Sequence, residues 1–404
     1  MNCQRGRSRR CISLAGSWRG AGVAFCLTTG CLALSFPLCA ETGYDAWLRY
    51  AEIDDKAVKQ HYDTLPAVVV ALDDAVVVKA AQEELFRGVR GMLGRTLRVE
   101  TQVPGEGAIL LGTFDAIAKA VPGIGRAPGL EPDGYWLKTI QVGGHSYLVV
   151  TAPNDRGVLY GAFALLRKIG LNEPVTNLDV KESPFAPIRM LNQWDNLDGT
   201  IERGYAGASI FFESNNVGTN LNRVRDYARL MASAGINGCA INNVNANARV
   251  ITPGFLPQLA RVAEVFRPWG VRLLVSIDFS SPKKIGGLDT FDPLDPGVAA
   301  FWRETADEIY RAIPDFGGFV LKVDSEGRLG PSAYGRTHAD AANVIARALK
   351  PHGGVLFYRG FVYDHHMDWR NPQERPRHRR LRQLPPARRA VRGQRHHPDQ
   401  TRAD

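Results

Sequence analysis

Cysteine is almost absent from the body of this chain, although the whole sequence contains six. Five of them lie within residues 1–40, and beyond that stretch only Cys239 remains, inside an apolar run. A single cysteine excludes an intrachain disulfide and a thiolate zinc cluster in the body. Cys239 is therefore predicted to be a core thiol.

The body also lacks the positive charge that the formal total of +9 suggests. Residues 1–40 contribute +5 and residues 371–404 contribute +7, which leaves −3 for the residues between them. A folded nucleic-acid-binding domain presents a clustered basic face. We therefore expect no nucleic-acid partner for the folded part, and only the basic tail keeps open the alternative of binding nucleic acid or an acidic surface.

A convincing membrane span is missing as well. The apolar run 23–38 is short and contains Gly30 and Pro37. It follows five arginines and ends just before Ala40, a pattern typical of an export signal. Residues 1–40 are thus predicted to be a signal peptide cleaved after Ala40, giving a periplasmic or secreted protein without stable membrane association. An uncleaved membrane anchor is the alternative.

Signs of a cofactor are also missing. The run Gly123-Ile124-Gly125 has no strand directly before it and no helix after it, so it does not predict a dinucleotide loop. His365 and His366 are adjacent and should face apart, and no carboxylate spacing supports them as metal ligands. We predict no metal and no organic cofactor.

Apolar periodicity divides the chain into segments of different character. Residues 41–184 predict a small N-terminal α/β domain, and residues 185–372 predict a regular alternation of strands and helices. That alternation favours a parallel barrel or a doubly wound sheet. Residues 373–404 are rich in Arg and Pro without any period, which predicts a disordered basic tail. The five strands expected in the second segment are 188–194, 236–244, 271–279, 319–323 and 355–363.

The stretch 317–327 is the best candidate for a site. An apolar run, Phe319 to Val323, predicts a buried strand, and Glu326 follows in an abruptly polar turn. Carboxylates at the carboxyl end of a barrel strand are where catalysis takes place. Lys322 lies four residues before Glu326, so a period of two places both side chains on the same side of a strand. A solvated surface loop is the alternative.

Two further residues of the expected strands, Arg359 and Trp194, have side chains suited to binding a ligand. Arg359 lies in an apolar run, where a charge is costly unless it is paired, and arginine binds carboxylates through two hydrogen bonds. The positive charge of Arg359 is paired either with a substrate carboxylate or with a carboxylate of the protein, in a structural ion pair. Trp194 ends the first expected strand, where an indole stacks on a sugar ring or packs in the core.

Four dense motifs stand out, at residues 43–50, 188–207, 321–327 and 357–370. Together they resemble the α-glucuronidases of glycoside hydrolase family 67. The resemblance implies an N-terminal α/β domain, a central (β/α)8 TIM-type barrel and a C-terminal helical domain that dimerises. It also implies hydrolysis of the α-1,2 bond of (4-O-methyl)glucuronic acid on glucuronoxylan-derived oligosaccharides, with inversion and without a cofactor.

The same resemblance assigns roles to single residues. Glu326 matches the general acid, whose pKa should be raised by partial burial. Lys322 matches a residue placed against the sugar, where a lysine would also hold down the pKa of a nearby acid, and a salt bridge in the barrel core is its alternative. Arg359 matches a residue that binds the uronate and Val244 one that narrows the sugar pocket, and a Trp at the position of Trp194 suits stacking on the sugar. Inversion also requires a second carboxyl function, about 6.5–9.5 Å from the acid.

The sequence departs from the family after the fifth strand. Three further strands, two further carboxylates that activate water and the dimerising domain are not recognisable. One permitted coding of residues 395–400, read one nucleotide later, gives the apolar run Val-Ile-Ile-Gln-Ile-Lys, so a frameshift near residues 371–374 is the expected cause. We therefore expect an incomplete barrel that is inactive as written, with a non-catalytic carbohydrate-binding remnant as the alternative.

Overall fold

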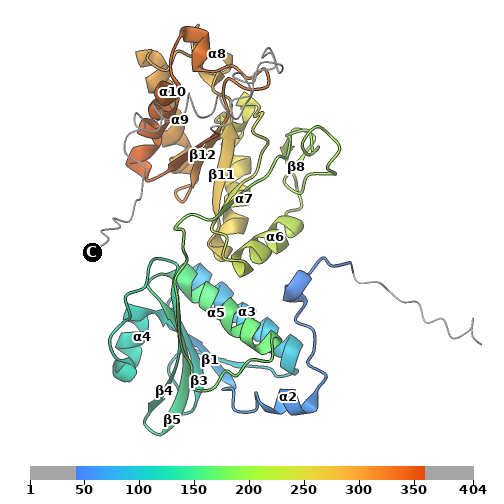
Figure 1. Cartoon of the computed structure of the whole chain (residues 1–404), viewed down its shortest axis with the longest axis vertical. Coiled ribbons are helices and arrows are strands. Elements are labelled where there is room, and N and C mark those ends of the chain that lie inside the picture. The colour runs from blue at the N-terminus through green and yellow to red at the C-terminus, as the bar shows by residue number, and fades with distance from the viewer. Residues whose placement is uncertain (1–41, 360–404) are drawn as a thin grey trace, which may run out of the picture. The chain divides into compact units, whose positions relative to one another are not determined.

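The computed structural model describes residues 42–359 of the chain (Figure 1). The predicted export signal, the two adjacent histidines and the basic tail lie outside the described residues. The chain divides into two units, and the described part of the first contains the short 3-10 helix η1 (Ala46–Arg49). Within residues 42–359, no helix combines the length and apolar character needed to cross a membrane.

The first sheet of the second unit has six strands in the order β2-β1-β3-β5-β4-β6. The β4–β5 hairpin and the β4–β6 pair are antiparallel, whereas the other neighbours are parallel. This arrangement confirms a small α/β domain at the N-terminal side. Its strands are β1 (Val68–Ala71), β2 (Arg98–Glu100), β3 (Ala108–Thr113), β4 (Tyr135–Val142), β5 (His145–Ala152) and β6 (Asp179–Glu182).

Helices cover both faces of this sheet, which explains why successive valines of β1 are all buried. Helices α3 (Val76–Leu93) and α5 (Asp155–Gly170) pack side by side on one face, and α4 (Phe114–Ala120) lies on the other (Figure 1). Gly88 of α3 permits the close approach, because a side chain there would clash with Leu166 of α5. Short helices α2 (Lys56–Gln60) and η2 (Pro122–Ile124) complete this part.

The second sheet has five strands, all parallel, in the order β13-β12-β11-β10-β7. Each strand pairs with the one before it in the chain. A doubly wound sheet would reverse its order at a switch point, whereas consecutive order is that of a barrel. All five expected strands are present but shorter than predicted: β7 (Met190–Asn192), β10 (Gly238–Ala240), β11 (Arg272–Ile277), β12 (Gly318–Leu321) and β13 (Val355–Tyr358).

Helices connect these strands and complete the β/α alternation. The main helices are α6 (Asn222–Ser233), α7 (Leu256–Phe266), α9 (Pro296–Ala312) and α10 (His338–Leu349). The loop after β7 carries a small hairpin, β8 (Phe212–Glu213) and β9 (Asn216–Val217). The remaining short elements are η3 (Ala248–Ile251), η4 (Arg267–Trp269), α8 (Ser281–Lys284), η5 (Pro331–Tyr334) and η6 (Lys350–His352).

The five-stranded sheet curls, and two long side chains reach toward each other across its inner side from beyond the two edge strands. The guanidinium of Arg359, directly after β13, lies 5.2 Å from the ring centre of Trp194, two residues after β7. The inner side is filled by a small apolar core, as inside a TIM barrel. That core consists of Ala240, Val244, Leu274 and Val320, with Met190, Trp194 and Phe357 packed against it.

A buried ion pair joins α3 of the first sheet's layer to α6 of the second. The carboxylate of Glu84 is fully buried and accepts hydrogen bonds from Arg229, at 2.6 Å from Nη2 and 2.9 Å from Nε, and from the Tyr50 hydroxyl at 2.6 Å. Arg87 adds a third donor at 3.0 Å. Removing one partner of such a pair leaves the other charge buried without compensation.

Glu84→Ala should therefore lower the free energy of unfolding by about 3 kcal/mol, because Arg229 would lose its buried counter-charge. Urea denaturation followed by circular dichroism measures the change. Glu83→Ala, which removes the exposed neighbouring carboxylate, is the matched control and should change stability by less than about 0.5 kcal/mol. Equal effects of the two substitutions would contradict a structural role for the Glu84–Arg229 pair.

Candidate active site

Glu326 lies in a tight turn directly after β12. Asp324, Glu326 and Gly327 all have positive φ, at 47°, 50° and 74°. Left-handed conformations are unfavourable for residues other than glycine and cluster at functional sites. The turn is tied to the segment that follows it, because the Asp324 carboxylate accepts hydrogen bonds from the backbone N–H and the hydroxyl of Ser332. The chain thus places Glu326 in a strained turn that is tied to the segment after it.

Lys322 is buried, with 3% of its surface exposed, and its ammonium has two partners. It donates to the side-chain oxygen of Asn245 at 2.8 Å and to the carboxylate of Glu326. The expected pairing of Lys322 with Glu326 is present, but the expected reason is wrong. Strand β12 ends at Leu321, so the turn, and not the period of a strand, brings the two side chains together.

The pKa of Glu326 is lower than its usual value, which is the effect expected of the neighbouring lysine and not the rise expected from partial burial. The hydrogen bond from Lys322 is the largest cause, and the positive charges of Lys322, Arg203 and Arg359 act in the same direction. Burial raises the pKa of Glu326, but this effect is the smaller one because about a third of the Glu326 side chain is exposed. In the unliganded protein Glu326 is therefore a carboxylate at neutral pH.

Arg359 and Trp194 close the site on the opposite side. The guanidinium lies over the indole ring, a cation–π arrangement. The backbone N–H of Arg359 donates to the carbonyl of Leu321 at 2.9 Å, which ties the end of β13 to that of β12. No ion pair joins Arg359 to a carboxylate within residues 42–359. The alternative of a structural ion pair thus finds no support in this part of the chain.

The five residues singled out from the sequence come together at one end of the curled sheet. Val244 is 1% exposed and belongs to the same apolar core as Trp194. It lies in the loop after β10, which ends at Ala240, and not within a strand as expected. Trp194, Lys322, Glu326 and Arg359 thus lie together at this end of the sheet, while the roles of all five residues stay predictions.

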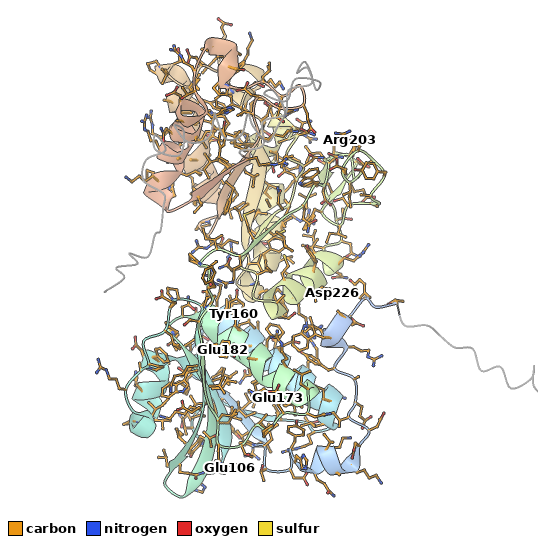
Figure 2. All side chains as sticks on the ribbon, in the orientation of Figure 1. Glu106, Tyr160, Glu173, Glu182, Arg203 and Asp226 are labelled. Atoms are coloured by element: carbon orange, nitrogen blue, oxygen red, sulfur yellow. The ribbon has the colours of Figure 1, made fainter. Side chains whose placement is uncertain are left out.

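Sequence reasoning missed several residues that take part in this arrangement. Arg203, on the long loop after β7 (Figure 2), lies 3.6 Å from the second oxygen of Glu326. Asp278, just beyond β11, pairs with Lys284 at 2.6 Å and with Arg328 at 3.3 Å, which anchors the loop carrying Glu326. A polar residue shortly after a strand was the available signal for Asp278. Nothing local in the sequence indicates the contact of Arg203.

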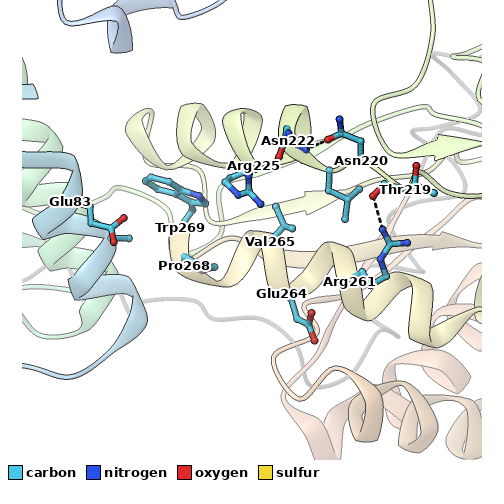
Figure 3. Close-up of a pocket in the computed structure, with 12 residues that line it drawn as sticks. Glu83, Thr219, Asn220, Asn222, Arg225, Arg261, Glu264, Val265, Pro268 and Trp269 are labelled. Atoms are coloured by element: carbon cyan, nitrogen blue, oxygen red, sulfur yellow. Dashed lines mark hydrogen bonds between the residues drawn. The ribbon is translucent and has the colours of Figure 1, made fainter. Parts of the chain in front are cut away.

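Two of the described pockets differ in their relation to the predicted site residues. A pocket of about 250 Å³ opens between the loops after β7 and β10, and Asn245, the partner of Lys322, lines it. A larger one of about 810 Å³ lies between α6 and α7, with Glu83 of α3 at its margin (Figure 3). None of the five predicted site residues lines the larger pocket. We therefore place the chemistry at the strand ends and not in that groove.

Comparison with known proteins identifies the family. The model of the glycosyl hydrolase family 67 middle domain matches residues 168–384, and that of the family's N-terminus matches residues 46–165. The chain belongs to glycoside hydrolase family 67. Two curated relatives agree, a probable alpha-glucuronidase A of Aspergillus terreus, 45% identical over 345 residues, and the alpha-glucuronidase A of Emericella nidulans, 43% identical over 362 residues.

The chain spans about two fifths of the length of those two relatives. The alignments cover 82% and 86% of the chain, but 40% and 42% of the relatives. Among solved structures, a family GH115 4-O-methyl-α-glucuronidase with specificity for decorated arabinogalactans has a TM-score of 0.46 and 17% identity, with 71% of the chain and 39% of that structure covered. A GH20 β-N-acetylhexosaminidase from Streptomyces coelicolor has a TM-score of 0.44 and 12% identity, with 72% and 62% covered. At this level of similarity neither structure bears on activity.

Lys322→Met should raise the pKa of Glu326, because it removes the largest cause of the lowering. A ¹³C NMR titration of the carboxyl groups measures the pKa, and the spectrum of Glu326→Gln identifies the resonance. Lys283→Met, which removes an exposed lysine, is the control and should leave the pKa unchanged. A Glu326 pKa that stays low in Lys322→Met would contradict the assignment.

The same pair makes stability depend on pH in a defined direction. Because the folded-state pKa of Glu326 is depressed, its ionisation stabilises the fold above the unfolded-state pKa. That contribution is lost as the pH falls through the folded-state pKa. We expect it to be small, since the Glu326 side chain is about one-third exposed.

Proposed function

We propose that this chain carries the uronate-binding and acid-donating part of an α-glucuronidase site. The substrate would be a xylo-oligosaccharide that bears (4-O-methyl)glucuronic acid in α-1,2 linkage, cleaved with inversion. The convergence of Lys322 and Arg359 beside Glu326 and Trp194 is the observation that carries this proposal. The membership of family 67 and the names of the α-glucuronidase relatives support it.

Charge makes this end of the sheet suited to an anionic sugar. Lys322, Arg203 and Arg359 all lower the pKa of Glu326, and Arg203 also pairs with Glu202, so three positive charges face two carboxylates there. Arg359 has a guanidinium that is planar and offers two parallel donors to a carboxylate. A uronate would complete the charge balance, and a neutral hexose would not.

The apolar side chains at the same place suit the remainder of the sugar ring. Trp194 is half-buried and presents part of its indole, while Val244 lies beneath it in the core. An indole face can pack against the C–H groups of a pyranose through apolar contact. The site thus combines a cationic side for the carboxylate with an apolar side for the ring.

Substrate binding would also change the protonation of Glu326. In the unliganded protein Lys322 holds the pKa of this carboxyl low. A uronate carboxylate that takes a hydrogen bond from Lys322 or Arg359 would weaken that effect and add a negative charge nearby. Both changes raise the pKa of a neighbouring acid, so we infer that Glu326 becomes a proton donor only beside its anionic substrate.

Inversion further requires a carboxylate that activates water. Within residues 42–359, the other carboxylates near this end of the sheet have a partner or are buried. Asp278 pairs with Lys284 and Arg328, and Asp324 accepts from Ser332. Asp198 accepts from Thr200, Glu202 lies 3.7 Å from Arg203, and Asp195 is buried. Asp364 lies outside the described residues. We therefore propose that the 404-residue chain binds uronates without measurable turnover, as a carbohydrate-binding protein.

Uronate binding is tested by titrating the full chain with D-glucuronate and with D-glucose, using saturation-transfer NMR. Glucuronate should bind and glucose should bind more weakly, because only the former carries the carboxylate. Arg359→Gln should weaken glucuronate binding roughly 10- to 100-fold, as expected for loss of a charged hydrogen-bond pair. Arg303→Gln, at an exposed position of α9, is the control. Equal binding of both sugars would overturn the proposal.

Turnover is tested on aldouronic acids with the same preparations. We expect no release of 4-O-methylglucuronic acid by the 404-residue chain, because no free water-activating carboxylate is found in the described part. Hydrolysis by the unaltered chain that disappears in Glu326→Gln would show that a base is present after all. Asp195 and Asp198 would then be the first candidates within the described residues.

A further inference from the structure

The two carboxylate oxygens of Glu326 face different cations. Oε2 accepts a hydrogen bond from the buried ammonium of Lys322, whereas Oε1 lies 3.6 Å from Nη2 of Arg203. Lys322 directly follows β12, and Arg203 comes from the long loop after β7 (Figure 2). Within residues 42–359, these two residues are the ones that form ion pairs with Glu326. Separate segments therefore act on the two sides of one carboxyl group.

The guanidinium of Arg203 is placed by charge and not by hydrogen bonds. Its Nε lies 3.7 Å from Oε1 of Glu202, so this contact and the one with Glu326 are both too long for a hydrogen bond. In the part of the chain that the structure describes, the Arg203 side chain makes no hydrogen bond, although a guanidinium offers five donors. The side chain is also 70% exposed. Arg203 thus keeps its donors for another acceptor.

The backbone that carries Arg203 is fixed, even though its side chain is not. The N–H of the preceding residue, Glu202, donates to the carbonyl of Trp194 at 2.8 Å. The carbonyl of Glu202 accepts a hydrogen bond from Nδ2 of Asn196 at 2.9 Å. The loop therefore presents Arg203 from a defined position beside the site, and rotation of the side chain is enough to move the guanidinium.

Glu326, in contrast, is held at both its backbone and its side chain. Residues 325–328 form a turn that is closed by a hydrogen bond of 3.0 Å from the last N–H to the first carbonyl. Both central residues of this turn have positive φ, as in a type I′ turn. Arg328 at its end pairs with Asp278 at 3.3 Å, and Lys322 holds the carboxylate. The guanidinium is therefore the member of the ion pair that can move.

The hydrogen bond from Lys322 decides which oxygen of Glu326 can carry a proton. An ionised carboxylate only accepts hydrogen bonds, whereas the neutral acid has one O–H group. Because the ammonium donates to Oε2, a proton added to Glu326 belongs on Oε1. Arg203 lies against that oxygen, where its positive charge opposes protonation. The contact therefore keeps Glu326 ionised in the unliganded protein.

The other charged groups near Glu326 leave this role to Arg203. Lys322 is bound to Oε2, and Arg359 acts on Glu326 through its charge, without an ion-pair contact in the described residues. Glu202 has 18% of its side chain exposed and gives the guanidinium a second carboxylate partner. Arg203 thus keeps a counter-charge whether or not it contacts Glu326.

We propose that Arg203 acts as a gate on Glu326: its guanidinium excludes a proton from Oε1 until the carboxylate of the substrate draws it away. A uronate in the site competes with Glu326 for the unused donors of Arg203, and exposed ion pairs are weak enough to be exchanged. Once Arg203 has turned away, Oε1 takes up a proton from water while Lys322 keeps its own. This inference rests on the proposed function, because the ligand that opens the gate is the uronate.

Arg203→Gln, which removes the charge and keeps a polar side chain, tests the gate in the unliganded full chain. The pKa of Glu326 should rise in this variant, because the cation against Oε1 is gone. A ¹³C NMR titration measures it, with the Glu326 resonance identified as for Lys322→Met. Arg303→Gln, at the exposed position of α9, is the control and should leave the pKa unchanged. A Glu326 pKa that Arg203→Gln does not alter overturns the proposal.

The same titration in saturating D-glucuronate shows whether Arg203 moves. In the complex, the pKa of Glu326 should be higher than in the free protein. It should also be nearly equal in the unaltered chain and in Arg203→Gln, because the ligand has already drawn the guanidinium away. A residue that merely supports the loop would cause the same difference with and without ligand. A difference that persists undiminished in the complex therefore overturns the gate.

Failure of the gate and failure of the uronate site give different results. Glucuronate binding with an undiminished effect of Arg203→Gln overturns the gate alone and leaves the uronate site standing. Absence of glucuronate binding to the unaltered chain overturns the uronate site, and with it the opening of the gate by a substrate. Melting temperatures from circular dichroism show that each variant is folded, as expected for substitutions at exposed positions.

Discussion

The buried ammonium of Lys322 is the constraint on which the rest of the site depends. A lysine with so little exposed surface is costly unless its charge is paired and its hydrogen bonds are made. Glu326 supplies the charge and Asn245 supplies the neutral acceptor. Since these partners come from the turn after β12 and the loop after β10, one buried charge fixes two loops against each other. The strained turn at Asp324 and Glu326 is thus stabilised from the side where substrate would bind.

The residues around the buried ammonium reach this end of the sheet from separate loops. Lys322 and Arg359 lie where β12 and β13 end, and Arg203 comes from the loop after β7. Side-chain amides and two carboxyls line the neighbouring pocket between the loops after β7 and β10. Curling of the sheet also encloses a small apolar core to which all five strands contribute a side chain.

Much of this arrangement could be predicted from the sequence, and the failures have physical causes. The five parallel strands were predictable because short apolar runs, each ending in polar residues, alternate with helical periods. Their ends were predicted too late, since apolar residues such as Val244 and Val323 continue to pack after the strand has ended. The rise in the pKa of Glu326 expected from burial is wrong, whereas the lowering by Lys322 could be expected from its position four residues away. The additional charges of Arg203 and Arg359 come from distant segments, so the sequence could not show that they act on Glu326. The asparagines within residues 242–247 are evident in the sequence, but only the fold shows that they line one pocket.

The single cysteine of the described residues has a consequence for dynamics. Cys239 lies in the middle of β10, paired with β7 on one side and β11 on the other, and it is completely buried. Burial raises the pKa of its thiol, so the reactive thiolate is suppressed while the sheet stays intact. Alkylation at this position must therefore wait for the strands to separate. The rate of labelling of the peptide that contains Cys239 would report how often the curled sheet opens, independently of any ligand.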